Sequence, residues 1–223
     1  MEAGIFATHH ISIDKHELAG LPCANFSGEA IVIDSADKID AAVDDLERAR
    51  IIGFDTETKP SFRRGIMYVV SLLQLSTPEK CYLFRLNKIG LHDRLVDLLE
   101  NPGLKKVGLS IHDDFHNLCK LRKINPDGFV DLQQYVKQFH IVDNSLTRIH
   151  AILFGERISK GQRLTNWEAA FLTLPQIHYA ALDASSCIRI YDYLSSGAFD
   201  PLKSPYLVPI PVPEPPAPQQ PVA

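Results

Sequence analysis

The chain has 223 residues, of which 45% are hydrophobic and 22% charged, and its formal net charge is −4. This length fits one full-sized domain with terminal extensions, and the composition excludes disorder over most of the chain. The negative charge argues against a surface that is basic throughout. No apolar run reaches the roughly 18 residues of a membrane span, and no signal-peptide pattern opens the chain, so we expect a cytoplasmic protein without a membrane partner.

The first half of the chain alternates strand and helix patterns. Residues 1–29 have no clear period and are expected to form an irregular N-terminal arm. A strand over 30–34 and an amphipathic helix over 39–46 follow. The next three apolar runs predict strands joined by short turns, which is typical of an antiparallel meander. These runs cover residues 51–55, 67–76 and 81–86.

Helices dominate the second half. Short strands are predicted over 105–110 and 128–132, the second one leading into a polar helix. Helical spacing, N-terminal caps and a proline near a helix start predict the remaining elements. These are helices over 90–100, 111–122, 145–154, 165–171 and 175–194. The pattern as a whole indicates an α/β domain with a mixed sheet.

The C-terminal residues 204–223 contain eight of the fifteen prolines of the chain. This composition favours extended polyproline II over helix or central strand. We interpret it as a solvated tail or one that wraps the domain, with a protein partner that binds proline-rich segments as the alternative. The predicted organisation is an arm over 1–29, a domain over 30–200 and a tail over 201–223.

Asp55 and Glu57 stand two residues apart at the end of an apolar strand. The period of two in a strand sends both side chains to the same face. Two carboxylates so close together disfavour joint ionisation unless a cation lies between them. Acidic residues at a strand end are more commonly turn or cap residues, so this pair needs support from other segments.

Asp114 lies near the start of the helix predicted over 111–122, next to Asp113. Both could complement the positive end of the helix dipole, and we interpret Asp113 in that way. Asp114, however, shares a helix face with Leu118 and Leu121. A carboxylate on the core-facing stripe is costly unless it is compensated, so Asp114 fits a buried metal ligand better.

Tyr179 and Asp183 lie one turn apart on the last predicted helix, so the phenol and the carboxylate point the same way. Together with Asp55-Thr56-Glu57 and with Asp114 in VGLSIHDD, they resemble the three ordered motifs of the DEDDy 3'-5' exonucleases, which include ribonuclease D and the Werner-type exonuclease domain. The similarity covers about residues 30–197 and includes VVSLLQLST and the segment from NSLTRIH to LTNWE.

The resemblance implies an RNase H-like fold, with a mixed five-stranded sheet flanked by helices. It further implies a metal-dependent 3'-5' exonuclease that releases nucleoside 5'-monophosphates by a two-metal-ion mechanism. Asp55, Glu57, Asp114 and Asp183 would hold two Mg²⁺ or Mn²⁺ ions, and Tyr179 would steer the attacking water. The expected partner is single-stranded nucleic acid with a free 3' end, either RNA or DNA.

The sister DEDDh group places a histidine five residues before its last aspartate, and His178 occupies that position. Residues four apart on a helix are about 40° apart around the axis, whereas residues five apart are about 140° apart. We therefore favour Tyr179 over His178 as the side chain that faces Asp183.

Basic and aromatic side chains near the motifs are candidate nucleic-acid contacts, because phosphate charge and base stacking dominate such binding. The candidates are Lys59, Phe62, Arg63, Arg64, Lys160 and Arg163. Trp167 is a further stacking candidate, although a core position is the simpler interpretation. Alternative functions are a catalytically inactive nucleic-acid-binding domain, an RNase H-like endonuclease, and an adaptor that acts through its proline-rich tail.

Overall fold

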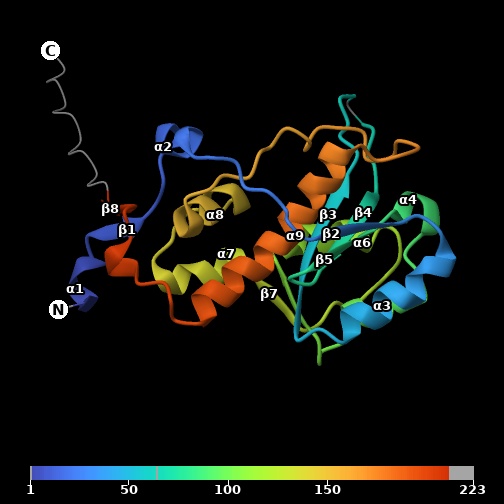
Figure 1. The fold of residues 1–223 in the computed structure, drawn as a ribbon, viewed down its shortest axis with the longest axis horizontal. Helices are drawn as coiled ribbons and strands as arrows, with labels where there is room; N and C mark the ends of the chain where they lie inside the picture. The colour runs from blue at the N-terminus through green and yellow to red at the C-terminus, as the bar shows by residue number, and fades with distance from the viewer. Residues whose placement is uncertain (1, 64, 211–223) are drawn as a thin grey trace, which may run out of the picture.

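A six-stranded mixed sheet forms the centre of the protein in the computed structural model, which describes residues 2–63 and 65–210 (Figure 1). The strand order is β2-β5-β4-β3-β6-β7. The strands are β2 (Glu29–Ile33), β3 (Ile51–Thr58), β4 (Val70–Ser76), β5 (Lys80–Phe84), β6 (Lys105–Gly108) and β7 (Phe129–Asp131).

The α/β class and the antiparallel meander β3-β4-β5 are confirmed, and the three other strands pair in parallel with their neighbours. The expected number of five strands is wrong. The predicted strand near residue 30 becomes the sixth member, because β2 pairs in parallel with β5 and extends that edge of the sheet.

Helices cover both faces of the sheet. On one face lie α3 (Ile39–Glu47), α5 (Asp93–Glu100) and α6 (Ile111–Leu118), whose apolar stripes share one core cluster with the sheet. On the other face lie α8 (Leu146–Phe154) and α9 (Leu174–Ser195). Short helices α4 (Leu86–Ile89) and α7 (Leu132–Tyr135) complete this part of the fold.

α9 packs unusually close to β3, and Gly53 makes this approach possible. A Cβ atom at Gly53 would lie 2.0 Å from the carbonyl oxygen of Ala184. The start of α9 is set by a capping box, in which Thr173 and Gln176 satisfy each other's backbone N–H groups. The capping box fixes where the helix begins, and the missing side chain of Gly53 allows its close approach to β3.

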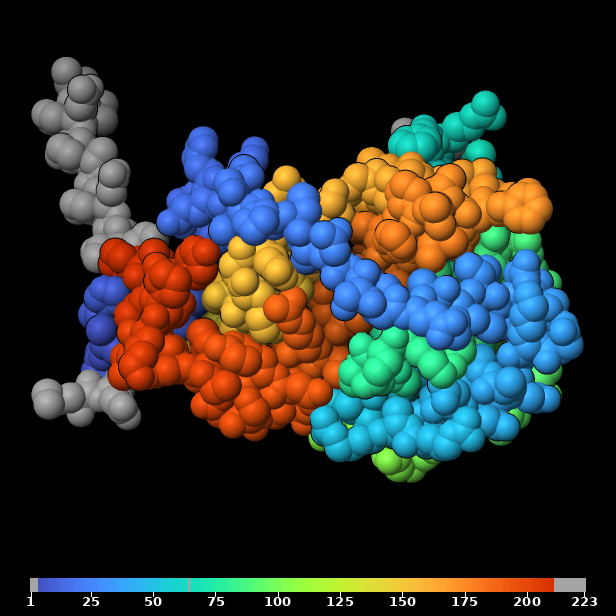
Figure 2. All heavy atoms as spheres, in the orientation of Figure 1, coloured from blue at the N-terminus to red at the C-terminus, as the bar shows by residue number. Residues whose placement is uncertain are grey.

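The N-terminal arm is not irregular, contrary to the expectation for residues 1–29. It contains α1 (Glu2–Ile5), β1 (His9–Ile11) and α2 (Lys15–Gly20). β1 pairs antiparallel with β8 (Leu207–Pro209), which lies within the region expected to be an extended tail. Ile11 and Ile13 are fully buried, so a short apolar alternation anchors the arm. Figure 2 shows the arm, in blue, running across the surface of the later parts of the chain.

The helix expected over 165–171 is also wrong, since these residues form turns. Side chains outside the segment donate hydrogen bonds to its backbone carbonyl groups. The amide of Gln176 donates to the Asn166 carbonyl at 3.3 Å, and the guanidinium of Arg85 donates to the Ala169 carbonyl at 2.5 Å. These tertiary contacts override the local helical pattern.

The proline-rich residues 211–223 lie outside the described residues, and the predicted protein partner of the tail stays a prediction. Within the described part of the chain, none of the helices combines the length and the apolar character needed to cross a bilayer.

Candidate active site

Three carboxylates from two elements converge where β3 passes under α9. One oxygen each from Asp55, Glu57 and Asp183 lies within 4.8 Å of the other two. Strand alternation brings Asp55 and Glu57 to the same face of β3, as expected. Asp183 reaches them because α9 lies against β3 at this point. Ala184, the residue that follows Asp183 on α9, contacts Gly53 of β3.

Asp114 lies beside this group but is not one of the three mutually close carboxylates. Its carboxylate accepts a hydrogen bond from the Thr56 hydroxyl, which points to the other face of β3. Asp114 is half-buried, whereas its neighbour Asp113 is exposed. The difference between the two acids is the one expected from the apolar stripe of α6.

Tyr179 and Asp183 line the same hollow of about 340 Å³ as Asp55 and Glu57. His178 is exposed and does not line this hollow; with Cys23 and Phe26 it lines a second hollow, which Tyr179 also borders. The structure therefore places the phenol of Tyr179, and not the imidazole of His178, next to the carboxylates.

The carboxylates hold their protons strongly because they are removed from water and repel one another. Burial, then the charges of Asp183, Asp114 and Glu57, raise the pKa of Asp55. Burial, then Asp183 and Asp114, raise the pKa of Glu57 to about 9, with Arg163 opposing.

Burial likewise raises the pKa of Asp183 to about 7, against the effect of the Tyr179 hydroxyl. It also raises the pKa of Asp114 to about 7, against the hydrogen bond from Thr56. The phenol of Tyr179 has its pKa raised by burial and by the negative charge of Asp183, so it stays protonated at neutral pH. A site of this kind favours a cation, which would replace the protons.

The candidate nucleic-acid contacts divide into two groups. Lys160 and Arg163 line the carboxylate hollow. Lys59, Phe62 and Arg63 line a neighbouring hollow of about 420 Å³, where Lys59 pairs with Glu168 at 3.1 Å and the Phe62 side chain is 81% exposed.

Arg64 lies outside the described residues. Trp167 is fully buried within the core, which removes it from the stacking candidates.

Several lining residues did not stand out in the sequence. They are Leu109, Asn144, Ser145, Leu146, Thr147 and Cys187. Asn144 to Thr147 fall in the NSLTRIH segment that carries part of the family resemblance. That segment could therefore have indicated that these residues lie near the site. Thr56 lies between Asp55 and Glu57 and also lines the hollow, and its tertiary contact with Asp114 links that carboxylate to β3.

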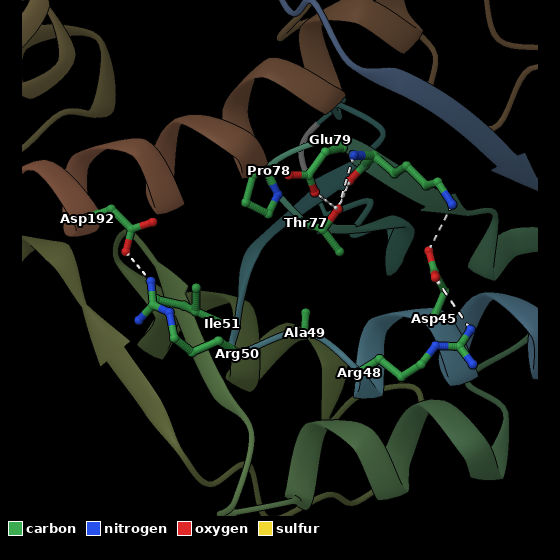
Figure 3. Close-up of a pocket in the computed structure, with 10 residues that line it drawn as sticks. Asp45, Arg48, Ala49, Arg50, Ile51, Thr77, Pro78, Glu79 and Asp192 are labelled. Carbon is green, nitrogen blue, oxygen red and sulfur yellow. Dashed lines mark hydrogen bonds and ion pairs between the residues drawn. The ribbon is translucent and has the colours of Figure 1, made fainter.

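A larger hollow of about 440 Å³ lies at the opposite end of β3, around Arg50 and Ile51 (Figure 3). Its basic side chains are already paired. Arg50 contacts Asp192 at 2.6 Å, and Lys80 contacts Asp45 at 3.2 Å. This hollow contains no cluster of carboxylates that could hold a metal, so the carboxylate hollow is the candidate active site among the described residues.

Comparisons with known proteins show what the chain is similar to. A family model described as 3'-5' exonuclease matches residues 30–197. The mouse bifunctional 3'-5' exonuclease/ATP-dependent helicase WRN is 31% identical over 157 residues, which cover 68% of this chain and 11% of that protein. The Aedes aegypti exonuclease mut-7 homolog is 27% identical over 186 residues, covering 72% of this chain and 26% of that protein.

Solved structures show the same fold. The Aedes aegypti Nibbler EXO domain superposes with a TM-score of 0.69 at 24% identity, covering 81% of this chain and 97% of that one. Escherichia coli RNase D superposes with a TM-score of 0.66 at 22% identity, covering 74% of this chain and 44% of that one. The expected RNase H-like fold is thereby confirmed. The chain spans only 11% and 26% of the lengths of the two relatives matched by sequence.

Proposed function

The chain belongs to the 3'-5' exonuclease family, whose members hydrolyse nucleic acids, and on that premise we propose that it removes nucleotides from the 3' end of single-stranded nucleic acid with the aid of two divalent cations. The observation that carries this proposal is the convergence of Asp55, Glu57 and Asp183 within 4.8 Å, beside the phenol of Tyr179. The products would be nucleoside 5'-monophosphates.

The donor atoms fit Mg²⁺ or Mn²⁺. The converging side chains offer only carboxylate oxygens, which suit these hard cations better than zinc. We propose that Asp55, Glu57 and Asp183 hold one ion, and that Asp55 and Asp114 hold the second, Asp114 directly or through water. When bound, such ions activate water and stabilise charge on the phosphate and on the leaving oxygen.

The other residues of the hollow would orient the reactants. The protonated Tyr179 can donate or accept a hydrogen bond, so it would fix the position of the attacking water. Lys160 and Arg163 line the same hollow and would pair with phosphate oxygens of the substrate. Lys59, Phe62 and Arg63 line the next hollow and would contact the preceding nucleotides through charge and stacking.

The substrate class is supported by a structural relative. Trypanosoma brucei RNase D was solved in a complex with RNA U12, and it superposes with a TM-score of 0.63 at 20% identity. Nucleic acid is therefore the substrate class that we propose, and RNA is the first substrate to test, with DNA of the same sequence as the comparison.

The decisive experiment uses 5'-labelled single-stranded RNA and DNA with Mg²⁺, with Mn²⁺ or with EDTA. We expect a ladder of products shortened from the 3' end, only when metal is present. Asp55→Asn should abolish the ladder. Asp113→Asn is the matched control, because it neutralises an exposed aspartate on α6 outside the hollow and should leave the ladder intact.

Two other results would contradict the proposal. Cleavage of a circular single-stranded substrate would indicate an endonuclease, because an exonuclease needs a free 3' end. Tight binding of the labelled strand without hydrolysis under any of the metal conditions would indicate a catalytically inactive binding domain.

A further inference from the structure

Gln74 lies directly opposite Asp55 in the antiparallel pair of β3 and β4. Residues opposite each other in such a pair project from the same face of the sheet, with Cβ atoms about 4.5–5.5 Å apart. The Gln74 side chain therefore lies on the face covered by α9, next to the carboxylate of Asp55. A five-atom side chain can reach across that separation.

The amide of Gln74 is fully buried and unused. Its side chain is 0% exposed, and neither its oxygen nor its nitrogen has a hydrogen-bond partner among the described residues. The buried hydroxyl of Ser76, two residues along β4, differs in this respect, because it donates to the Thr77 carbonyl at 2.7 Å. A buried amide without partners is unfavourable for stability. Its position beside Asp55 therefore indicates that it has a function when the site is occupied.

The chemistry of the amide matches what Asp55 needs. A carboxylate that binds a cation through one oxygen keeps lone pairs that can accept further hydrogen bonds. The Nε2 group of Gln74 can donate to such an oxygen without adding charge. Partners of this kind orient metal-binding carboxylates and increase their affinity for the ion.

The other side chains buried against Asp55 from the sheet and α9 offer weaker donors or none. The thiols of Cys81 and Cys187 are buried near Asp55, but a thiol is a poor donor. The Cys187 sulfur already contacts the Asp183 carbonyl oxygen at 3.4 Å. Leu72, which lies opposite Glu57 in the same register, has no polar atom in its side chain.

We infer that Gln74 is a positioning residue whose side-chain amide donates a hydrogen bond to Asp55 once a cation is bound, and so orients this carboxylate toward the ions. The inference rests on the proposed function, because it assigns Gln74 a task only if Asp55 binds metal. Gln74 itself touches neither ion nor substrate in this assignment.

The test compares Mn²⁺ binding and thermal unfolding of purified full-length variants. Gln74→Met keeps the length of the side chain and removes the donor. Leu72→Met is the matched control, because it makes a volume-conserving change on the same face of β4 opposite Glu57. We expect Gln74→Met to weaken Mn²⁺ binding about 10-fold to 100-fold, measured by calorimetry, while Leu72→Met binds like the wild type.

The unfolding temperature separates positioning from a structural role. Removing a buried amide that has no partner should leave the metal-free unfolding temperature unchanged or raise it. If Gln74→Met bound Mn²⁺ less tightly and also unfolded at a lower temperature than the wild type, the inference would be overturned. Gln74→Leu serves as the second variant if Gln74→Met does not fold, with the same expected results.

The outcomes also separate this inference from the proposed function. Wild-type affinity in Gln74→Met, together with loss of binding in Asp55→Asn, would overturn the role of Gln74 and leave the metal site intact. A wild-type protein that binds no Mn²⁺ would overturn both.

Discussion

The hydroxyl of Thr56 donates a hydrogen bond to the carboxylate of Asp114, which is 58 positions away in the sequence. Thr56 lies between Asp55 and Glu57 on β3, and Asp114 lies on α6. The strand therefore presents the carboxylates of Asp55 and Glu57 to one face of the sheet. From the opposite face, Thr56 donates a hydrogen bond to a third carboxylate, that of Asp114. This contact joins α6 to the strand that carries Asp55 and Glu57.

Replacing Thr56 with valine should impair catalysis without unfolding the protein. Valine has nearly the same shape but cannot donate, so the Asp114 carboxylate would lose its hydrogen bond from Thr56. A hydrogen bond to a charged group contributes about 1.5–3 kcal/mol, which corresponds to an about 10-fold to 100-fold loss of kcat/KM. Thr58→Val, on the same strand, is the control. Equal activity of Thr56→Val and the wild type in single-turnover hydrolysis would show that the contact has no catalytic consequence.

Replacing Gly53 with alanine should separate α9 from β3. The new Cβ would lie 2.0 Å from the Ala184 carbonyl oxygen, so the helix carrying Asp183 must shift. We expect a loss of stability of about 1–3 kcal/mol from overpacking and a loss of metal binding, measured by urea unfolding and calorimetry. Gly20→Ala is the control, because a Cβ at Gly20 has no neighbour within 4 Å. Unchanged metal binding in Gly53→Ala would contradict this role of the close contact.

Tyr179→Phe should lower kcat strongly, whereas His178→Ala should change it little. Tyr179 lines the carboxylate hollow, whereas the His178 side chain is exposed outside it. Removal of a positioned group that handles the attacking water should lower kcat about 100-fold or more. His178→Ala should change kcat little. If His178→Ala instead lowered kcat strongly in a steady-state assay and Tyr179→Phe did not, the site would belong to the DEDDh type.

The metal-free protein should lose stability as the pH rises from about 4 to about 9. Unfolded aspartate and glutamate titrate near about 4, whereas burial raises the pKa of Asp183 to about 7 and that of Glu57 to about 9. Between these pKa values the folded state therefore binds more protons than the unfolded state. Stability is highest at a pH below the pKa of the unfolded carboxyl groups, and it falls as the pH rises through the pKa values of the folded protein.

Added Mg²⁺ should reverse this trend. The ion competes with protons for the same oxygens, so the rise in unfolding temperature on adding millimolar Mg²⁺ should increase with pH. Differential scanning fluorimetry across this range measures both effects. Glu57→Gln should flatten the pH dependence and reduce the response to Mg²⁺, and a metal response that is independent of pH would contradict the linkage.

Local pattern was sufficient for much of this protein. The alternation of β3 placed Asp55 and Glu57 on one face, and helical spacing placed Tyr179 beside Asp183 and Asp114 on the inner face of α6. These features depend on the fixed periods of strand and helix, so neighbouring residues are enough to specify them.

Other features depended on contacts between distant segments, and local pattern gave the wrong result for them. Residues 165–171 form turns whose backbone carbonyl groups accept hydrogen bonds from Arg85 and Gln176, and β1 of the arm pairs with β8.

The local direction of the acidic side chains follows from neighbouring residues alone, because backbone periodicity is a short-range property. Three other features required the folded domain: Asp183 meets Asp55, Thr56 contacts Asp114, and Gln74 lies beside the site. Each of these depends on how strands pair and how closely α9 approaches at Gly53, which are determined by packing across the whole domain.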